Sequence, residues 1–244
     1  MAKRGWIYTE KDVHREWLKK IEQGEIGREW YLLIFRKKLK IVKEFLDKEC
    51  KGKRILDVGC GEGILVEEYR KKGYDIEGVD PNYESDFVKI GDVTDLEYED
   101  NSFDVILLLD VLEHIPYDKQ YIALKEIKRV LKKGGLLLMN VPNLAAFSSR
   151  IKFLIFGKLS RADKDFNHVG ERPFEEYKEL LVKHGFKINK VWGITITLPL
   201  IWQLVTYFPQ RLAFIHDYLL NCLNIPSLSL FTMFLIENLK QSDR

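Results

Sequence analysis

The stretch ILDVGCGEG, residues 55–63, decides the fold. Its apolar residues predict a short buried strand, and its glycines at alternate positions predict a sharp turn directly after that strand. Glycine there lets the backbone approach a ligand, because no Cβ stands in the way. A tight strand-to-helix turn that binds nothing also explains the glycines. A dinucleotide loop with the spacing GxGxxG needs glycine where Ile64 stands, so a nucleoside-like cofactor without phosphates fits better.

Outward from this loop, short apolar runs alternate with amphipathic segments. The runs are RILDV (54–58), DIEGVD (75–80), FVKIGD (87–92), FDVILLLD (103–110) and LLLMNV (136–141). This alternation predicts an α/β fold in which a parallel sheet is wound with helices. Helices are expected at 119–132, with Gly134-Gly135 as the C-cap, and at 174–184.

The N-terminal part of the chain has a different pattern. Residues 10–50 are rich in Lys and Glu with apolar residues at helical spacing, which predicts two helices. We therefore expect N-terminal helices over 1–50 and the main domain over 51–244.

Composition narrows the function classes. Hydrophobic residues make up 46% of the chain and the net charge is +2, so we expect a globular protein without dedicated nucleic-acid binding. Three widely spaced cysteines, with no CxxC pair, indicate neither a zinc motif nor a disulfide framework and favour a cytoplasmic location. Neither a signal peptide nor a membrane-spanning segment is expected.

Two acids follow the second and third apolar runs. Asp80 stands where a carboxylate can accept hydrogen bonds from both ribose hydroxyls. Asp92 could accept a hydrogen bond from an exocyclic amine such as that of adenine. Each acid alone is explained as a turn residue. Because the carboxyl ends of parallel strands meet at one edge of a sheet, the two acids and the glycine loop together predict a nucleoside site.

Taken in order, ILDVGCGEG, VDP, GDV, DNSFDVILLLDVLEHI and LKEIKRVLKKGGLLLMNVPN resemble the motifs of class I S-adenosylmethionine-dependent methyltransferases. The pieces DVLEHI and HVGERPFEEYKELLVKHGF are similar to the branch that contains the ubiquinone-biosynthesis O-methyltransferases. The resemblance implies a Rossmann-like doubly wound, mostly parallel sheet with an antiparallel last strand. It also implies S-adenosyl-L-methionine as cofactor.

The resemblance assigns cofactor contacts to particular residues. The glycine loop passes the methionine part, the acid after the second strand takes the ribose, and the acid after the third takes adenine. The cofactor-binding residues that it implies are Asp57, Gly59, Cys60, Gly61, Asp80, Pro81, Asp92, Val93 and Leu109.

The segment after the fourth strand holds the catalytic candidates. His114 is a candidate general base, because an imidazole ordinarily titrates near neutral pH, and Asp110 is the second candidate. Ubiquinone-type O-methyltransferases carry an acidic-xx-Glu-His motif that holds a divalent metal, completed by an Asn. The resemblance places that set on Asp110, Glu113, His114 and Asn143, oxygen-rich ligands that suit Mg²⁺. Asp110 is shorter than the Glu of those enzymes, and Glu113 and His114 could instead cap a helix and line the pocket without metal.

One further histidine has two interpretations. His168 lies before Glu171-Arg172-Pro173, in a loop expected over the cofactor edge. It is either a substrate contact or lid residue, or a surface histidine.

The C-terminal part is unusually apolar. FKINKVW and LFTMFLIENL predict antiparallel strands, with a hydrophobic helical insertion at about 195–228 between them. The insertion could pack as a cap on the sheet or form a homodimer interface. It could also be an apolar lid that admits a lipid-like acceptor or rests on a membrane surface. The basic, apolar segment SSRIKFLIFGK (148–158) favours peripheral membrane contact.

These patterns lead to one expected activity with alternatives. We expect methyl transfer to a small-molecule or lipid-like acceptor, with oxygen favoured over nitrogen. A tRNA or protein methyltransferase, and a non-catalytic cofactor-binding subunit, are the alternatives.

Overall fold

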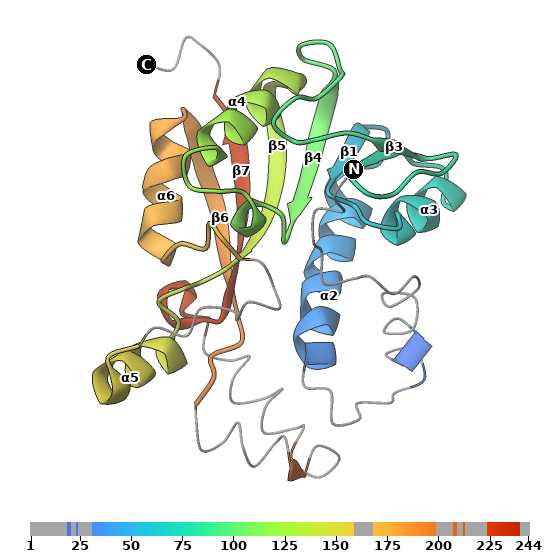
Figure 1. The fold of residues 1–244 in the computed structure, drawn as a ribbon. Helices are drawn as coiled ribbons and strands as arrows, with labels where there is room; N and C mark the ends of the chain where they lie inside the picture. Colours follow the sequence, from blue (N-terminus) through green and yellow to red (C-terminus); the bar gives the residue numbers. More distant parts are fainter. Residues whose placement is uncertain are drawn as a thin grey trace.

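The computed structural model describes residues 31–158, 168–198 and 224–239, together with Lys19, Lys20, Gln23, Tyr207, Phe208 and Leu212. Its strands form one seven-stranded sheet with helices on both faces (Figure 1). The strands are β1 (Arg54–Val58), β2 (Asp75–Asp80), β3 (Val88–Ile90), β4 (Phe103–Leu109), β5 (Leu131–Pro142), β6 (Phe186–Ile194) and β7 (Phe231–Asn238). The helices are α2 (Tyr31–Glu49), α3 (Ile64–Lys71), α4 (Gln120–Val130), α5 (Phe147–Phe156) and α6 (Phe174–Lys183), with 3-10 turns η1 (Leu112–His114) and η3 (Pro226–Leu228).

The sheet has the order β3-β2-β1-β4-β5-β7-β6. Strands β1 to β5 are parallel, whereas β7 runs antiparallel to both β5 and β6. The Rossmann-like, mostly parallel fold with an antiparallel last strand is thereby confirmed. The chain moves outward from β1 to β3 and then returns to place β4 on the other side of β1. Ligands of such sheets bind at this switch point, beyond the carboxyl ends of β1 and β4.

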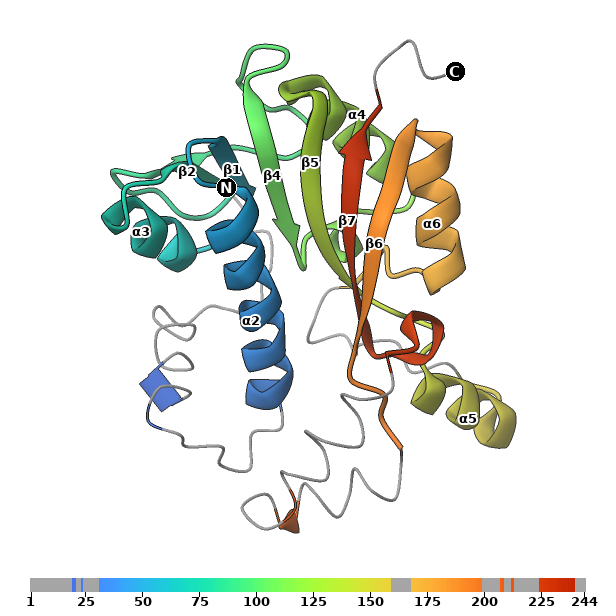
Figure 2. The ribbon, with the colours of Figure 1, turned by 180° about the vertical axis from the view of Figure 1, so that it is seen from behind.

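Helices cover the two faces of the sheet in different pairs. Apolar residues of α4 and α6 pack with one face in a single buried cluster, and those of α2 and α3 pack with the other (Figures 1 and 2). Ile34 and Leu46 of α2 share their cluster with Ile55 of β1. The described part of the N-terminal segment therefore belongs to the core of the domain.

Most expected boundaries agree with the structure, with one correction. Helix α6 matches the expected helix over 174–184, and β6 pairs with β7 as expected, from Phe186 with Asn238 to Ile194 with Phe231. The predicted glycine C-cap of α4 is wrong, because β5 begins at Leu131 and contains both glycines. There the pairing with β4 shifts register, and Gly134 has a φ of 77°. The glycines therefore form an irregularity inside a strand.

Two expectations fall mostly outside the described residues, namely the first N-terminal helix and the insertion at about 195–228. In the described part of the chain, no helix has both the length and the apolar character needed to cross a membrane.

Candidate cofactor and catalytic site

The three glycines of the loop after β1 have different structural reasons. All three have positive φ values, between 56° and 72°. A Cβ on Gly59 would lie 2.4 Å from a methyl carbon of Val111, and one on Gly63 would lie 2.4 Å from a methyl carbon of Val88. A Cβ on Gly61 would meet no heavy atom of the described residues within 4 Å. Packing therefore requires the outer two glycines, whereas Gly61 faces open space.

Two buried carboxylates lie beside this loop. Asp80, the last residue of β2, accepts hydrogen bonds from the backbone N–H of Gly61 at 2.9 Å and of Asn82 at 2.8 Å. Burial raises the pKa of Asp80. Burial and the negative charge of Asp80 raise the pKa of Asp57, in β1, to about 7. The loop and the ends of the two strands thus bring two carboxylates to one place.

This site fits an adenosyl sulfonium. Within the described ranges, neither Asp57 nor Asp80 has a Lys or Arg within ion-pair distance. Buried carboxylates favour a cationic partner, and a sulfonium carries that charge. Each oxygen of Asp80 keeps acceptor capacity after its backbone contact, which suits the two hydroxyls of a ribose.

Cys60 is placed differently from its neighbours. A Cβ on Gly78 would lie 2.5 Å from its sulfur, so the side chain packs against β2. Burial raises the pKa of its thiol. Cys60 can therefore offer a cofactor only its backbone.

The remaining cofactor candidates lie along the same edge of the sheet. Asp92 accepts hydrogen bonds on one oxygen from the backbone N–H and the hydroxyl of Thr94, at 2.9 and 2.8 Å, which fixes the turn after β3. Pro81 is exposed, Val93 is buried and Leu109 is half-buried at the end of β4. Their contacts with a cofactor stay predictions.

Asp110 follows β4 with a φ of 56° and donates its backbone N–H to the carbonyl of Asn140 at 3.0 Å. Its carboxylate forms an ion pair with Lys38 of α2 and accepts a hydrogen bond from the Asn140 amide. Sequence reasoning missed Lys38. The available signal was its position, four residues from both Ile34 and Val42, within the apolar stripe of the helix.

Asn143 serves a structural purpose. Its Nδ2 donates to the carbonyls of Ser227 and Ser229, and its Oδ1 accepts from the N–H groups of Ala145 and Phe174. These bonds tie the end of β5 to α6 and to η3. Asp110 is thus bound to Lys38 and Asn143 is fully engaged in this structure. The magnesium set of Asp110, Glu113, His114 and Asn143 stays a prediction.

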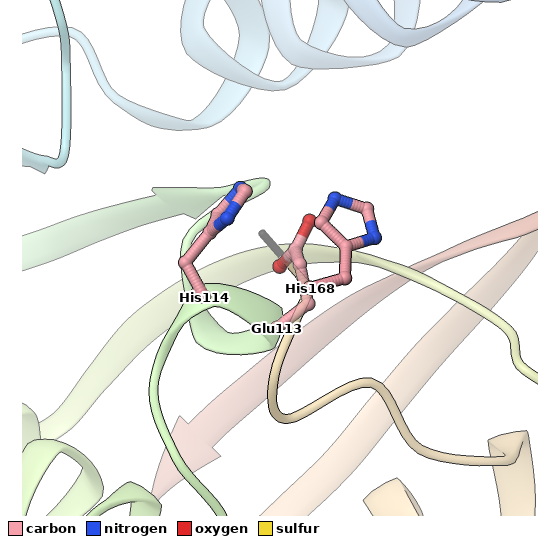
Figure 3. Close-up of side chains that lie close together, drawn as sticks. All are labelled: Glu113, His114 and His168. Atoms are coloured by element: carbon pink, nitrogen blue, oxygen red, sulfur yellow. The ribbon is translucent and has the colours of Figure 1, made fainter. Parts of the chain in front are cut away.

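The structure instead brings Glu113 and His114 together with His168 (Figure 3). One ligand atom from each of the three lies within 4.8 Å of the others. The two imidazole rings meet edge to face, with centroids 4.8 Å apart. The side chain of His168 is only 10% exposed, so its interpretation as a surface residue is wrong.

Glu113 is the acid of this group, and it is almost completely buried. It is 1% exposed, and neither carboxylate oxygen has a hydrogen-bond partner among the described residues. Burial, together with the negative charge of Asp110, raises the pKa of Glu113 well above its usual range. This buried carboxylate needs a proton or a cation to compensate its charge.

A Rossmann-like sheet with a glycine loop and acids at the ends of β1 and β2 defines a nucleoside-binding protein. A family model described as "Methyltransferase domain" matches residues 31–191. The chain therefore belongs to the class I S-adenosylmethionine-dependent methyltransferase family.

Particular relatives agree with this membership. The chain is 29% identical over 166 residues to a probable S-adenosylmethionine-dependent methyltransferase of Mycolicibacterium smegmatis, covering 63% of this chain and 60% of the relative. It is 36% identical over 107 residues to a ubiquinone biosynthesis O-methyltransferase of Nitrosococcus oceani, covering 38% of this chain and 44% of the relative. The matches thus span about half the length of these relatives.

A solved structure supports the fold. The structure of a methyltransferase from Thermotoga maritima, described as a possible histamine N-methyltransferase, has a TM-score of 0.59 at 21% identity. The match covers 90% of this chain and 97% of that one.

Proposed function

We propose that the protein transfers a methyl group from S-adenosylmethionine to an oxygen of a small-molecule, lipid-like acceptor. The observation that carries this proposal is the pair of buried carboxylates, Asp57 and Asp80, beside a glycine loop with open space at Gly61. When bound, the cofactor supplies an electrophilic methyl carbon. The protein has to hold the donor, align the acceptor and exclude water.

Different residues of this chain would hold the donor and accept the proton of the acceptor. Asp80 holds the ribose, and the charge of Asp57 attracts the sulfonium. His114 follows the end of β4, at the same edge of the sheet, where it can accept the proton of an acceptor hydroxyl. A methyl acceptor at oxygen needs such a base more than an amine does, which supports oxygen as the methylated atom.

The relatives support a ring-type acceptor. Besides the ubiquinone biosynthesis O-methyltransferase, a demethylmenaquinone methyltransferase of Staphylococcus aureus is 31% identical over 179 residues, covering 59% of this chain and 72% of that protein. Both names refer to quinones, whose rings carry apolar chains. A quinone-like acceptor is therefore the substrate class that we favour.

Helix α5 supports a lipid-like acceptor and contact with a membrane surface. It extends from the carboxyl end of β5, beyond the sheet (Figure 1). Four consecutive apolar side chains, Phe153 to Phe156, are 52% to 79% exposed. Residues 147–158 contain Arg150, Lys152 and Lys158 but no acid. Apolar side chains beside cations suit a bilayer with anionic headgroups. The alternative use of this face is a homodimer interface.

The cofactor half of the proposal is tested by calorimetry with S-adenosylhomocysteine. Asp80→Ala is expected to weaken binding roughly 10-fold to 100-fold, because hydrogen bonds to a charged group are lost. Asp86→Asn, an exposed acid before β3, is the matched control and should bind as the wild type does. Unchanged affinity in Asp80→Ala would contradict the assigned site.

The acceptor half is tested with labelled S-adenosylmethionine and a whole-cell extract. Products are partitioned into lipid, small-molecule, RNA and protein fractions. Label in the lipid or small-molecule fraction is expected, whereas label in RNA or protein alone would establish one of the alternative methyltransferase activities. Binding without any turnover would indicate a non-catalytic subunit.

A further inference from the structure

We propose that Glu113, His114 and His168 form a three-ligand site for a divalent transition metal of the zinc class. This set shares Glu113 and His114 with the predicted magnesium set, and takes His168 in place of Asp110 and Asn143, which have other partners in the structure. Its members come from two segments far apart in the sequence, η1 and the loop before α6 (Figure 3).

The loop that carries His168 is fixed to η1 by its backbone. Gly170 donates its N–H to the carbonyl of Glu113 at 2.8 Å, and its own carbonyl accepts from the side chain of Gln120 at 2.7 Å. A Cβ on Gly170 would lie 1.9 Å from the carbonyl oxygen of Ile115, so only glycine allows this approach. The three side chains are therefore brought together by defined backbone contacts between the loop and η1.

Glu113 gives an independent reason for a cation. Glu113 is 1% exposed, its carboxylate oxygens have no hydrogen-bond partner in the part of the chain that the structure describes, and it belongs to the same cluster as the two imidazoles. Lys38, on the neighbouring helix, forms an ion pair with Asp110, and its charge also acts on Glu113. A divalent ion would compensate the buried charge and give both oxygens a possible ligand contact.

His168 has the environment of a metal ligand. A carboxylate oxygen of Glu171 lies 3.5 Å from Nδ1 of His168, and both side chains are at most 10% exposed. A carboxylate beside one imidazole nitrogen orients the ring and makes the other nitrogen a better metal ligand. In the structure this contact has the distance of an ion pair and is not a hydrogen bond. We expect it to shorten when the ring binds a metal, so that Glu171 would then position His168.

The donor set selects the kind of metal. Two imidazoles and one carboxylate are typical of zinc and related transition metals, whereas magnesium prefers oxygen ligands and retains water. In a zinc site with bonds of about 2.0–2.1 Å, tetrahedral ligand atoms lie roughly 3.3 Å apart. Here the ligand atoms lie within 4.8 Å of one another. Side-chain rotations that move these atoms by about 1 to 2 Å would bring them to the distances of a zinc site.

Three protein ligands leave a fourth position for an oxygen ligand. A metal there would lower the pKa of a bound acceptor hydroxyl. His114, as a ligand, would then hold the metal in place of the direct role as a base that is proposed above. This role of the metal rests on the proposed methyl transfer, whereas metal binding itself does not.

The test measures binding in the absence of cofactor and acceptor. Tag-free protein is stripped with a chelator and titrated by calorimetry with zinc chloride and, separately, magnesium chloride. We expect one zinc ion per chain and at least 100-fold weaker binding of magnesium. His168→Ala and Glu113→Gln should each weaken zinc binding at least 100-fold, and Glu171→Gln roughly 10-fold to 100-fold.

The matched control is His184→Ala, because His184 lies at the end of α6, outside the cluster. It should leave zinc binding unchanged. If the Glu113 variant fails to fold, the spectrum of Co²⁺ bound to the wild-type protein replaces it, with an intense tetrahedral absorption expected. Absence of stoichiometric zinc binding, an octahedral Co²⁺ spectrum, or equal zinc affinity in wild type and His168→Ala would each overturn the proposal. Methyl transfer without metal would leave the proposed function intact and remove only this site.

Discussion

Lys38 and Asp110 join α2 to the carboxyl end of β4, with the ammonium nitrogen 2.8 and 2.7 Å from the two carboxylate oxygens. The partners are buried unequally, since the Lys38 side chain is 5% exposed and that of Asp110 is 32% exposed. The ammonium also lies 3.5 Å from the centroid of the Phe231 ring. A helix from the N-terminal segment is therefore tied to the edge where the chemistry is expected.

This unequal burial predicts unequal effects of removing the two charges. Asp110→Asn keeps a side chain that tolerates a positive φ but leaves the buried ammonium without its counter-ion, so we expect a loss of roughly 2 kcal/mol of unfolding free energy. Lys38→Met keeps the apolar stem and leaves a carboxylate that reaches water, so the loss should be smaller, about 1 kcal/mol or less. Urea unfolding measures both. A larger loss for Lys38→Met would contradict the argument.

The loop glycines predict a separation of binding from folding. In Gly61→Ala the new methyl group meets no protein atom, so the positive φ should cost roughly 1 kcal/mol of stability while the methyl enters the ligand space and weakens cofactor binding. Gly63→Ala should lose more stability, because its Cβ would lie 2.4 Å from Val88. Thermal unfolding and calorimetry on both variants provide the comparison. Equal stability losses would show that the loop relaxes at both positions.

The pKa of Asp57 predicts how cofactor binding depends on pH. Because this pKa is about 7, the carboxylate becomes charged as the pH rises through neutrality. Affinity for the cationic cofactor should therefore rise up to about tenfold between roughly pH 6 and pH 8. Asp57→Asn should bind more weakly and lose most of that dependence. A wild-type affinity that is flat over this range would contradict the assignment.

The same pKa predicts the opposite trend for stability. The folded state holds the Asp57 proton more tightly than the unfolded chain does, so this group's contribution falls as the pH rises from about 4 to about 7. The difference in unfolding free energy between wild type and Asp57→Asn should change across this window. Urea unfolding at several pH values measures that difference.

The exposed face of α5 predicts binding to anionic vesicles. Leu154→Glu combined with Phe156→Glu should weaken sedimentation with phosphatidylglycerol vesicles at least about tenfold, because apolar contact is lost and negative charge is added. Val182→Glu is the matched control, since Val182 of α6 is apolar and 61% exposed. Wild-type protein that binds no vesicles but sediments as a dimer would assign this face to a homodimer interface.

The sequence predicted those parts of the molecule that depend on local periodicity. Glycines and acids that follow short apolar runs had to meet at one edge of a parallel sheet, so the positions of Asp57 and Asp80 could be foreseen. The ion pair of Lys38 could not, because its partner lies 72 residues away and no local pattern specifies it.

Contacts between distant residues also explain why the proposed metal ligands differ from those that the sequence predicted. The Asn143 amide donates to the backbone carbonyls of Ser227 and Ser229, more than 80 residues later. No residue near Asn143 in the sequence indicates this contact. His168 joins Glu113 and His114 only because Gly170 lets its loop lie against η1. Residue type identified the candidates, whereas tertiary contacts decided which of them meet.

The position of β7 has a consequence for how the chain matures. This strand is the last of the described elements, yet it lies between β5 and β6 and supplies the hydrogen-bond partner of each. During synthesis, β5 can pair with β4 early. β6 has no neighbouring strand to pair with until residues 231–238 have left the ribosome, because β7 lies between β5 and β6. Until then β5 offers an unpaired edge to other chains, so the nascent protein should depend on chaperones most between the synthesis of β5 and that of β7.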